Sequence, residues 1–179
     1  MSANQADWKN DFKMTVHQQK DQKGGRDDMM RGHGTYRNVT PEEVCEFFVN
    51  GENLPGLLKW VYVETLPNGD EIKFYLVKAP MCSPRENVLK YKIDKREDGS
   101  IFISMRSWVH NDYPINKQAI RAVYSNTTYI WPNAKDNTVE LIEYIQMNLR
   151  GNLTGRLNGA LGSGTINTNV AMMESIKKL

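Results

Sequence analysis

The sequence lacks most of the features that would indicate a catalytic or metal-binding protein. It has only 2 cysteines and 3 histidines in 179 residues, and their spacing matches no metal-binding motif. It contains no Gly-x-Ser-x-Gly nucleophile elbow, no glycine-rich phosphate-binding loop and no His-Glu-x-x-His segment. We therefore expect no enzymatic activity, no catalytic residues, no metal site and no cofactor.

The chain also has little net charge and no long apolar run. Its 23 basic and 21 acidic side chains leave a net charge of +2, too small a bias to indicate a nucleic-acid partner. No stretch approaches the roughly 18 apolar residues of a membrane-spanning helix, and residues 1–10 lack an apolar signal core. Cys45 and Cys82 fall in different predicted elements, which favours reduced thiols. These features predict one cytoplasmic domain over residues 1–179, in which residues 1–10 can be flexible.

What the sequence does contain is alternation of apolar and polar residues, which predicts an antiparallel sheet. Turn signals at Asn68-Gly69 and Glu97-Asp98-Gly99 separate neighbouring strands. We expect the segment 127–134 to be a short strand or an edge segment interrupted at Trp131-Pro132. The other predicted strands are 11–18, 29–36, 61–66, 72–78, 88–93, 100–110, 119–125 and 138–149.

Two helices are predicted. Thr40 and Glu43 form a capping-box pattern with Pro41 at the first helical position, so a short helix should span about residues 41–50. The segment 153–179 shows no strand alternation and ends in good helix formers, which predicts a long terminal helix. Its first half holds four glycines and should bend or fray near residues 162–164.

Period-two alternation also sorts the faces of the predicted strands. Leu89, Tyr91 and Ile93 share one side of their strand. The same logic places two residues of the preceding strand and four of the following strand on that side: Tyr75, Val77, Ile101, Ile103, Met105 and Ser107. The pattern leaves the last strand open, because either the set Leu141, Glu143, Ile145 and Met147 or the set Ile142, Tyr144 and Gln146 could face inward.

Several motifs, taken in order, resemble the START domains, the steroidogenic-acute-regulatory-related lipid-transfer family. The motifs are Lys59-Trp60, Lys78-Ala79-Pro80, Ser83-Pro84-Arg85-Glu86-Asn87-Val88, Pro114, Ile120-Arg121-Ala122 and Asn148-Leu149-Arg150-Gly151-Asn152-Leu153. The chain departs from the family pattern at three positions. Glu86 stands where aspartate is usual, Asn148 replaces the aspartate of the last motif, and Thr154 replaces the proline after it.

The resemblance implies an α+β helix-grip fold, in which a curved antiparallel sheet of about eight or nine strands wraps a long C-terminal helix around an apolar tunnel. It also implies a monomer that binds a single lipid, a phospholipid or a sterol, and carries it between membranes through transient contact with their surfaces. Sterol-carrying members place an acid and an arginine at positions that hold Tyr75 and Tyr91 here. The ligand-binding residues implied are Tyr75, Val77, Leu89, Tyr91, Ile103, Met105, Leu157, Leu161 and Thr165.

Other interpretations remain open at this point. The chain could be a helix-grip small-molecule sensor or polyketide-type enzyme, or an interaction module whose closed core contains Tyr75, Tyr91 and Met105. The basic residues of segment 85–96 could meet an anionic membrane or form an ordinary solvated face: Arg85, Lys90, Lys92, Lys95 and Arg96. The tunnel could be gated by the glycine-rich half of the terminal helix or by the loops 80–84 and 111–117.

Overall fold

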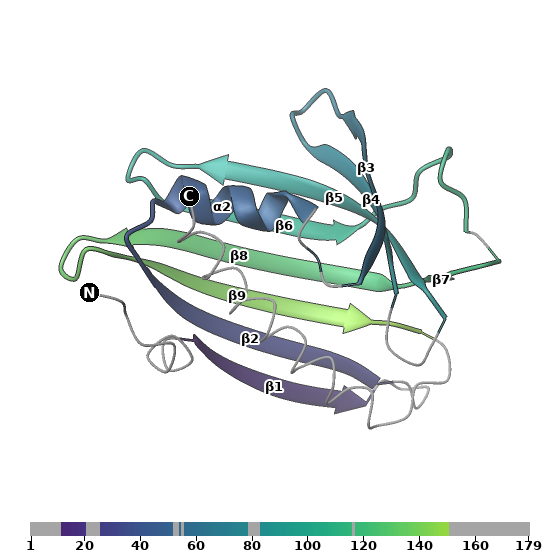
Figure 1. The fold of residues 1–179 in the computed structure, drawn as a ribbon, viewed down its shortest axis with the longest axis horizontal. Helices are drawn as coiled ribbons and strands as arrows, with labels where there is room; N and C mark the ends of the chain where they lie inside the picture. The colour runs from purple at the N-terminus through teal and green to yellow at the C-terminus, as the bar shows by residue number, and fades with distance from the viewer. Residues whose placement is uncertain are drawn as a thin grey trace.

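The chain folds into one large sheet with a short helix packed on it (Figure 1). The computed structural model describes residues 12–20, 26–51, 54, 56–78, 83–115 and 117–150. The predicted terminal helix at 153–179, with its glycine hinge, lies outside these residues, as does most of the predicted gating loop 80–84. Among the described residues, no helix is long and apolar enough to cross a membrane.

Within the described residues the sheet has nine strands, eight of which follow one another in the order β1-β2-β9-β8-β6-β5-β4-β3. All neighbours in this order are antiparallel, as the alternation predicted. The short β7 lies off this path and pairs with β5 in parallel. The strands are β1 (Phe12–Lys20), β2 (Arg26–Arg37), β3 (Leu57–Thr65), β4 (Glu71–Val77), β5 (Arg85–Lys95), β6 (Ile101–Ser107), β7 (Ile120–Arg121), β8 (Val123–Asn133) and β9 (Thr138–Asn148).

Two strand predictions were wrong. The segment 119–125 is not one strand, because Ile120–Arg121 pairs with β5 while Val123 begins the long β8. Trp131-Pro132 does not interrupt β8. The last pair of β8 with β6 is Ile130 with Ile101, so at Pro132 the strand has only β9 as a neighbour. A residue without an amide hydrogen is tolerated where one side of the strand has no partner.

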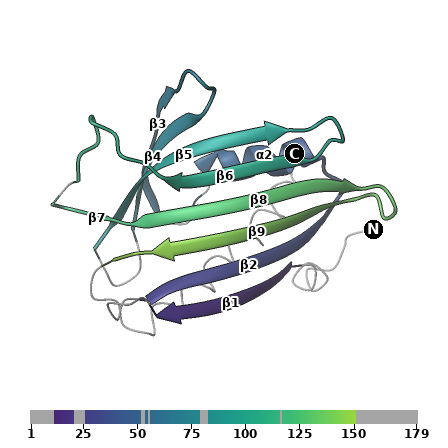
Figure 2. The same ribbon diagram turned by 180° about the vertical axis from the view of Figure 1, so that it is seen from behind.

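The helix α2 spans Pro41–Val49, as the capping signal predicted. Thr40 Oγ1 accepts from the Glu43 backbone amide at 3.2 Å, and the Thr40 amide donates to Glu43 Oε2 at 2.7 Å. Val44 and Cys45 bury the apolar side of the helix against the sheet. The two views of the ribbon place α2 on one face of the sheet only (Figure 2). We call this face the inner face and the opposite one the outer face.

The inner face carries the main core, to which α2, β4, β5, β6, β8 and β9 all contribute buried side chains. A smaller cluster of Ile72, Phe74 and Val88 lies on the outer face of β4 and β5. It is covered by residues of β3 and by Tyr113, whose ring stacks on Phe74 with a centroid distance of 4.9 Å. The sheet is therefore packed on both faces around β4 and β5, which fixes these two strands firmly.

Candidate functional site

The inner face brings together six of the nine residues that the sequence indicated as ligand-binding. All six belong to the inner-face core or pack against it: Tyr75, Val77, Leu89, Tyr91, Ile103 and Met105. The register explains why, since Tyr91 pairs with Met105 and Ile93 with Ile103 across β5 and β6. Cross-strand partners share a face of the sheet. The remaining three, Leu157, Leu161 and Thr165, lie outside the described residues.

Tyr75 and Tyr91 form a buried polar pair within this apolar surface. Their hydroxyl oxygens lie 2.7 Å apart, and the two side chains are 2% and 4% exposed. Burial raises the pKa of both phenols, so both are neutral at physiological pH. One hydroxyl must donate to the other, which leaves the second hydrogen of the pair available to another acceptor.

Sequence reasoning also missed Lys73, which is buried on this face at 4% exposure. Its Nζ donates to the Val49 carbonyl at 3.1 Å, at the C-terminal end of α2, and pairs with Glu71 at 2.9 Å. It also lies 4.8 Å from the centroid of the Tyr91 ring. The ammonium group is thus held by a helix end, a carboxylate and an aromatic face, all of which favour a cation.

The middle of β8 adds a chain of polar side chains that sequence reasoning missed. Thr128 Oγ1 donates to Asn126 Oδ1 at 2.7 Å, and Asn126 Nδ2 donates to the Tyr124 hydroxyl at 3.2 Å. Asn126 and Thr128 are 2% and 0% exposed. The segment Ser125 to Thr128 is polar at every position, so alternation could not assign its faces. Only its pairing with β6 and β9 does so.

The structure also settles the orientation of β9. Leu141, Glu143 and Ile145 are buried, whereas Tyr144 is 50% exposed on the outer face. Glu143 pairs with Thr128 on one side and with Gly32 of β2 on the other. Glu143 is 1% exposed. Burial of Tyr36 and Tyr124 raises the pKa of both phenols, and the negative charge of Glu143 raises them further.

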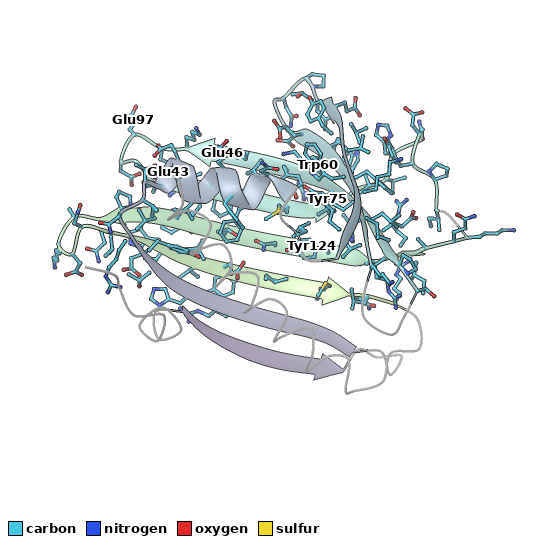
Figure 3. The ribbon with its side chains drawn as sticks, viewed as in Figure 1. Glu43, Glu46, Trp60, Tyr75, Glu97 and Tyr124 are labelled. Atoms are coloured by element: carbon cyan, nitrogen blue, oxygen red, sulfur yellow. The ribbon has the colours of Figure 1, made fainter. Side chains whose placement is uncertain are left out.

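The labelled side chains of Trp60, Tyr75 and Tyr124 can be followed in Figure 3, where they gather beside the C-terminal end of α2. Trp60 and Tyr124 pack against the same core cluster that contains Tyr75. Tyr75 and Tyr124 are close enough for an electrostatic interaction. The two tyrosines of β4 and β5 and the polar chain of β8 are therefore parts of one polar region set in an apolar surface.

The two motifs around Arg85 and Arg121 are joined at one end of the sheet. Arg85 pairs with Ile120 and Glu86 with Arg121, and the Arg121 and Glu86 side chains form an ion pair at 3.0 Å. Arg85 is 3% exposed and donates to the carbonyls of Ser83, Leu149 and Arg150. It therefore ties the start of β5 to the end of β9, and it does not belong to the basic surface predicted for segment 85–96.

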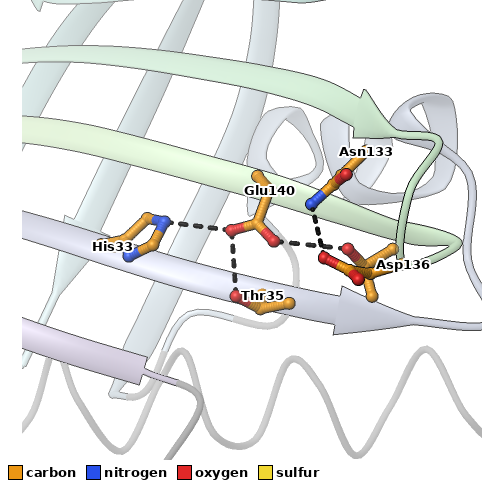
Figure 4. Close-up of polar contacts among 6 residues, drawn as sticks. His33, Thr35, Asn133, Asp136 and Glu140 are labelled. Atoms are coloured by element: carbon orange, nitrogen blue, oxygen red, sulfur yellow. Dashed lines mark hydrogen bonds and ion pairs between the residues drawn. The ribbon is translucent and has the colours of Figure 1, made fainter.

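The polar side chains of His33, Thr35 and Glu140 lie together on the outer face and are not arranged as a nucleophile and its base (Figure 4). His33 Nε2 lies 3.0 Å from Glu140 Oε2, and Thr35 Oγ1 donates to the same oxygen at 2.9 Å. Both side chains are bound to one carboxylate, so His33 is not placed to activate the Thr35 hydroxyl. Within the described ranges, no group of three histidine, cysteine or acidic side chains could hold a metal ion.

Comparison with known proteins shows which solved structures have a similar fold. No protein-family model and no curated protein sequence matches the chain. Among solved structures, human StAR-related lipid transfer protein 5 superposes with a TM-score of 0.73 at 16% identity, over 92% of this chain and 82% of that one. Human STARD10 gives a TM-score of 0.74 at 13% identity, over 99% and 81% of the two chains. The STAR-related lipid transfer protein of Xanthomonas axonopodis gives 0.68 at 16% identity, over 90% and 98%. The chain thus has the START-domain fold that its motifs indicated.

Proposed function

We propose that this chain binds a single lipid, of the phospholipid or sterol class, on the inner face of its sheet and carries it between membranes as a monomeric cytoplasmic protein without catalytic activity. The observation that carries the proposal is the composition of that face. Large apolar side chains surround a few buried polar groups. In a lipid site the apolar surface supplies affinity and the polar groups fix the orientation of the ligand. Two of the solved structures that share the fold are lipid transfer proteins by name.

The energetics suit a lipid ligand. Each methylene group that leaves water for an apolar surface contributes about 0.8 kcal/mol, so a chain of about ten methylenes needs few polar contacts for strong binding. Side chains such as Leu89, Ile103 and Met105 supply the apolar surface. The polar region around Tyr75, Tyr91 and Tyr124 would then fix which end of the lipid lies deepest.

Native mass spectrometry of the protein purified from cells tests the proposal directly. We expect a co-purified lipid and a thermal midpoint that rises with lipid concentration, because a ligand that binds only the folded state stabilises it. Met105→Trp should block the inner face and lower binding, whereas Ser104→Trp, on the adjacent outward position of β6, should not. A protein that carries no lipid and shows no midpoint shift with any lipid would favour the closed interaction module or the small-molecule sensor instead.

A carrier must also meet a membrane, and the loop 108–115 offers a surface for this contact. Val109 is 88% exposed, Ile115 70% and Trp108 38%. Exposed aliphatic side chains beside a tryptophan are typical of segments that enter the membrane interface. The loop is held in place because Arg121 donates to the Tyr113 carbonyl at 2.9 Å. We propose that this loop, rather than the basic residues of β5, touches the membrane first.

The two candidate surfaces lie at opposite ends of the sheet (Figure 1). β5 begins at Arg85, which pairs with Ile120 beside the loop, and ends at Lys95. Eleven residues of strand span about 35 Å, so Lys95 and Arg96 would meet a flat bilayer together with Val109 only if β5 lay along the membrane surface. Lys90 Nζ forms an ion pair with Asp70 Oδ2 at 2.9 Å.

Co-sedimentation with phosphatidylcholine vesicles, with and without phosphatidylserine, separates the two surfaces. We expect Val109→Glu with Ile115→Glu to weaken binding several-fold, because two charges would enter the interface. Lys95→Glu with Arg96→Glu should have little effect, and Ala134→Glu, an added acid in the turn between β8 and β9, serves as control. A loss confined to the Lys95 and Arg96 variant would assign docking to the basic surface.

A further inference from the structure

The exposed charged side chains that the structure describes are distributed unevenly between the two ends of the sheet. We propose that the docking partner is an anionic membrane, and that four exposed basic side chains beside the loop 108–115 select it. We call these residues the basic collar: Lys78, Arg106, Lys117 and Arg150. This inference rests on the proposed membrane contact of the loop and names the lipid charge that the contact requires.

Two of the collar residues lie beside each other because two strands end around Arg85. Lys78 follows Val77, which pairs with Arg85 across β4 and β5. The Arg85 guanidinium donates to the Arg150 carbonyl at 3.1 Å, just beyond the end of β9. Both exposed cations therefore stand at the edge of the sheet where β5 begins.

The other two collar residues flank the docking loop. Arg106 lies in the last two residues of β6 and three residues before Val109. Lys117 lies three residues before Ile120, the residue of β7 that pairs with Arg85. Three residues of extended chain span at most about 10 Å, which is close to the Debye length of about 10 Å at 0.1 M salt. The charge of Arg106 can therefore act on lipid headgroups that Val109 approaches.

The collar cations are available to a partner, whereas other charges at this end are paired within the protein. Among the described residues, none of the four collar side chains forms an ion pair or a side-chain hydrogen bond. By contrast, Arg121 pairs with Glu86 at 3.0 Å, and His110 Nε2 lies 3.0 Å from Glu64 Oε1. An anionic surface would thus meet cations that lose no partner on binding.

The balance of exposed charge reverses from one end of the sheet to the other. At the loop end, the exposed charged residues of segments 78, 83–84, 106–115, 117–119 and 148–150 are the four collar cations and Asp112. At the opposite end, segments 37–46, 94–99 and 134–137 hold four exposed bases and seven exposed acids. The bases are Arg37, Lys95, Arg96 and Lys135, and the acids are Glu42, Glu43, Glu46, Asp94, Glu97, Asp98 and Asp136.

This polarity favours one orientation at a negatively charged surface. Glu43, Glu46 and Glu97 mark the acidic end in Figure 3, on the side of the sheet away from β7 and the loop. An anionic bilayer attracts the collar and repels the opposite end, so the field of the whole domain turns the loop toward the membrane. The low net charge of the chain conceals this separation of the two signs.

An anionic bilayer suits this end better than a nucleic acid does. Interfacial segments place apolar side chains among the lipid chains and basic ones at the level of the headgroups. Val109 and Ile115 are 88% and 70% exposed and supply the apolar part. Single-stranded nucleic acids are held by cations together with open aromatic rings. The Trp108 ring is partly occupied, since Lys90 Nζ lies 4.7 Å from its centroid.

Co-sedimentation of the full chain tests the inference with vesicles of phosphatidylcholine alone and of phosphatidylcholine mixed with phosphatidylserine. We expect binding to the mixed vesicles to be at least about tenfold tighter, because each basic residue near an anionic surface strengthens binding about fivefold. Raising the salt from about 0.1 M to about 1 M shortens the Debye length to about 3 Å. It should abolish the difference between the two kinds of vesicle.

Charge-neutral variants identify the residues. Arg106→Gln with Lys117→Gln should weaken binding to the mixed vesicles by about twentyfold and leave binding to phosphatidylcholine unaltered. Lys78→Gln with Arg150→Gln provides a second pair from the same collar, with the same expected loss. Lys95→Gln with Lys135→Gln removes two exposed cations from the opposite end and serves as the matched control. Urea unfolding should show the same midpoint for all of these variants.

The outcomes separate this inference from the proposed membrane contact. If no vesicle is bound, or if Val109→Glu with Ile115→Glu changes nothing, the loop is not a docking surface and both proposals fall. Equal binding to the two kinds of vesicle, or an equal loss in the collar and control pairs, would overturn the collar and leave the contact of the loop intact. Tighter binding of a labelled single-stranded oligonucleotide than of mixed vesicles, lost in both collar pairs, would overturn it in favour of nucleic acid.

Discussion

The hydroxyl pair of Tyr75 and Tyr91 allows a sharp test of how the inner face is built. The two oxygens lie 2.7 Å apart, one on β4 and one on β5, in a region where both side chains are almost fully buried. Replacing either tyrosine by phenylalanine keeps the ring and removes the hydroxyl. Each single variant therefore leaves one buried hydroxyl without its partner, whereas the double variant removes both polar groups together.

The burial of both hydroxyls determines how much stability each substitution should cost. A neutral hydrogen bond contributes about 0.5–1.5 kcal/mol net, and a buried polar group left without a partner costs about 1–3 kcal/mol. We expect Tyr75→Phe and Tyr91→Phe each to lower the free energy of unfolding by about 1–3 kcal/mol. The double variant should cost less than the sum of the two by about 1 kcal/mol or more, because the second change removes the group that the first one stranded.

Urea unfolding of the four proteins of this cycle, without added lipid, gives the coupling free energy. Tyr144→Phe serves as the matched control, since Tyr144 lies on the outer face of β9 and is 50% exposed; it should change stability by less than about 0.5 kcal/mol. If the two single effects simply add, or if each is no larger than that of Tyr144→Phe, the hydroxyls do not form a buried pair and the polar region has been assigned incorrectly.

Three further predictions concern residues that support the strands of the inner face. Gly51→Ala should destabilise the protein by about 1–3 kcal/mol in chemical unfolding, because a methyl group there would overlap the Tyr75 ring and lie 2.9 Å from Trp60 Cδ1; an unchanged midpoint would show that both rings move easily. Lys90 holds the pKa of Asp70 below its usual range, so this pair stabilises the fold above the unfolded pKa of about 4 and is lost as the pH falls through the folded value. Asp70→Asn should accordingly cost stability at pH 7, with a difference from the parent that shrinks as the pH falls below about 4; a difference independent of pH would mean that the charge is not responsible. Arg85→Met should cost about 3 kcal/mol, since it strands the carbonyls of Leu149 and Arg150, while Lys92→Met, an exposed change on the same strand, should have little effect.

The sequence by itself determined the local elements. Period-two alternation located most strands, the Thr40 and Glu43 capping pattern located α2, and Asn68-Gly69 and Asp98-Gly99 located tight turns whose glycines adopt positive φ. These signals are readable because they depend on residues within a few positions of one another. The inward set on β5 followed in the same way, since one side of that strand is apolar and the other charged.

The tertiary structure alone decided what the polar residues do. Asn126 and Thr128 sit in a segment without alternation, and Glu143 belongs to a strand on which either face could have been buried. Their orientation comes from pairing across the sheet between segments far apart in sequence, because a shift of one residue in the register would turn every side chain to the other face. In the same way, Arg85 looks like a surface charge in the sequence, and it is buried only because β9 ends beside it and supplies two carbonyl groups that a guanidinium can satisfy.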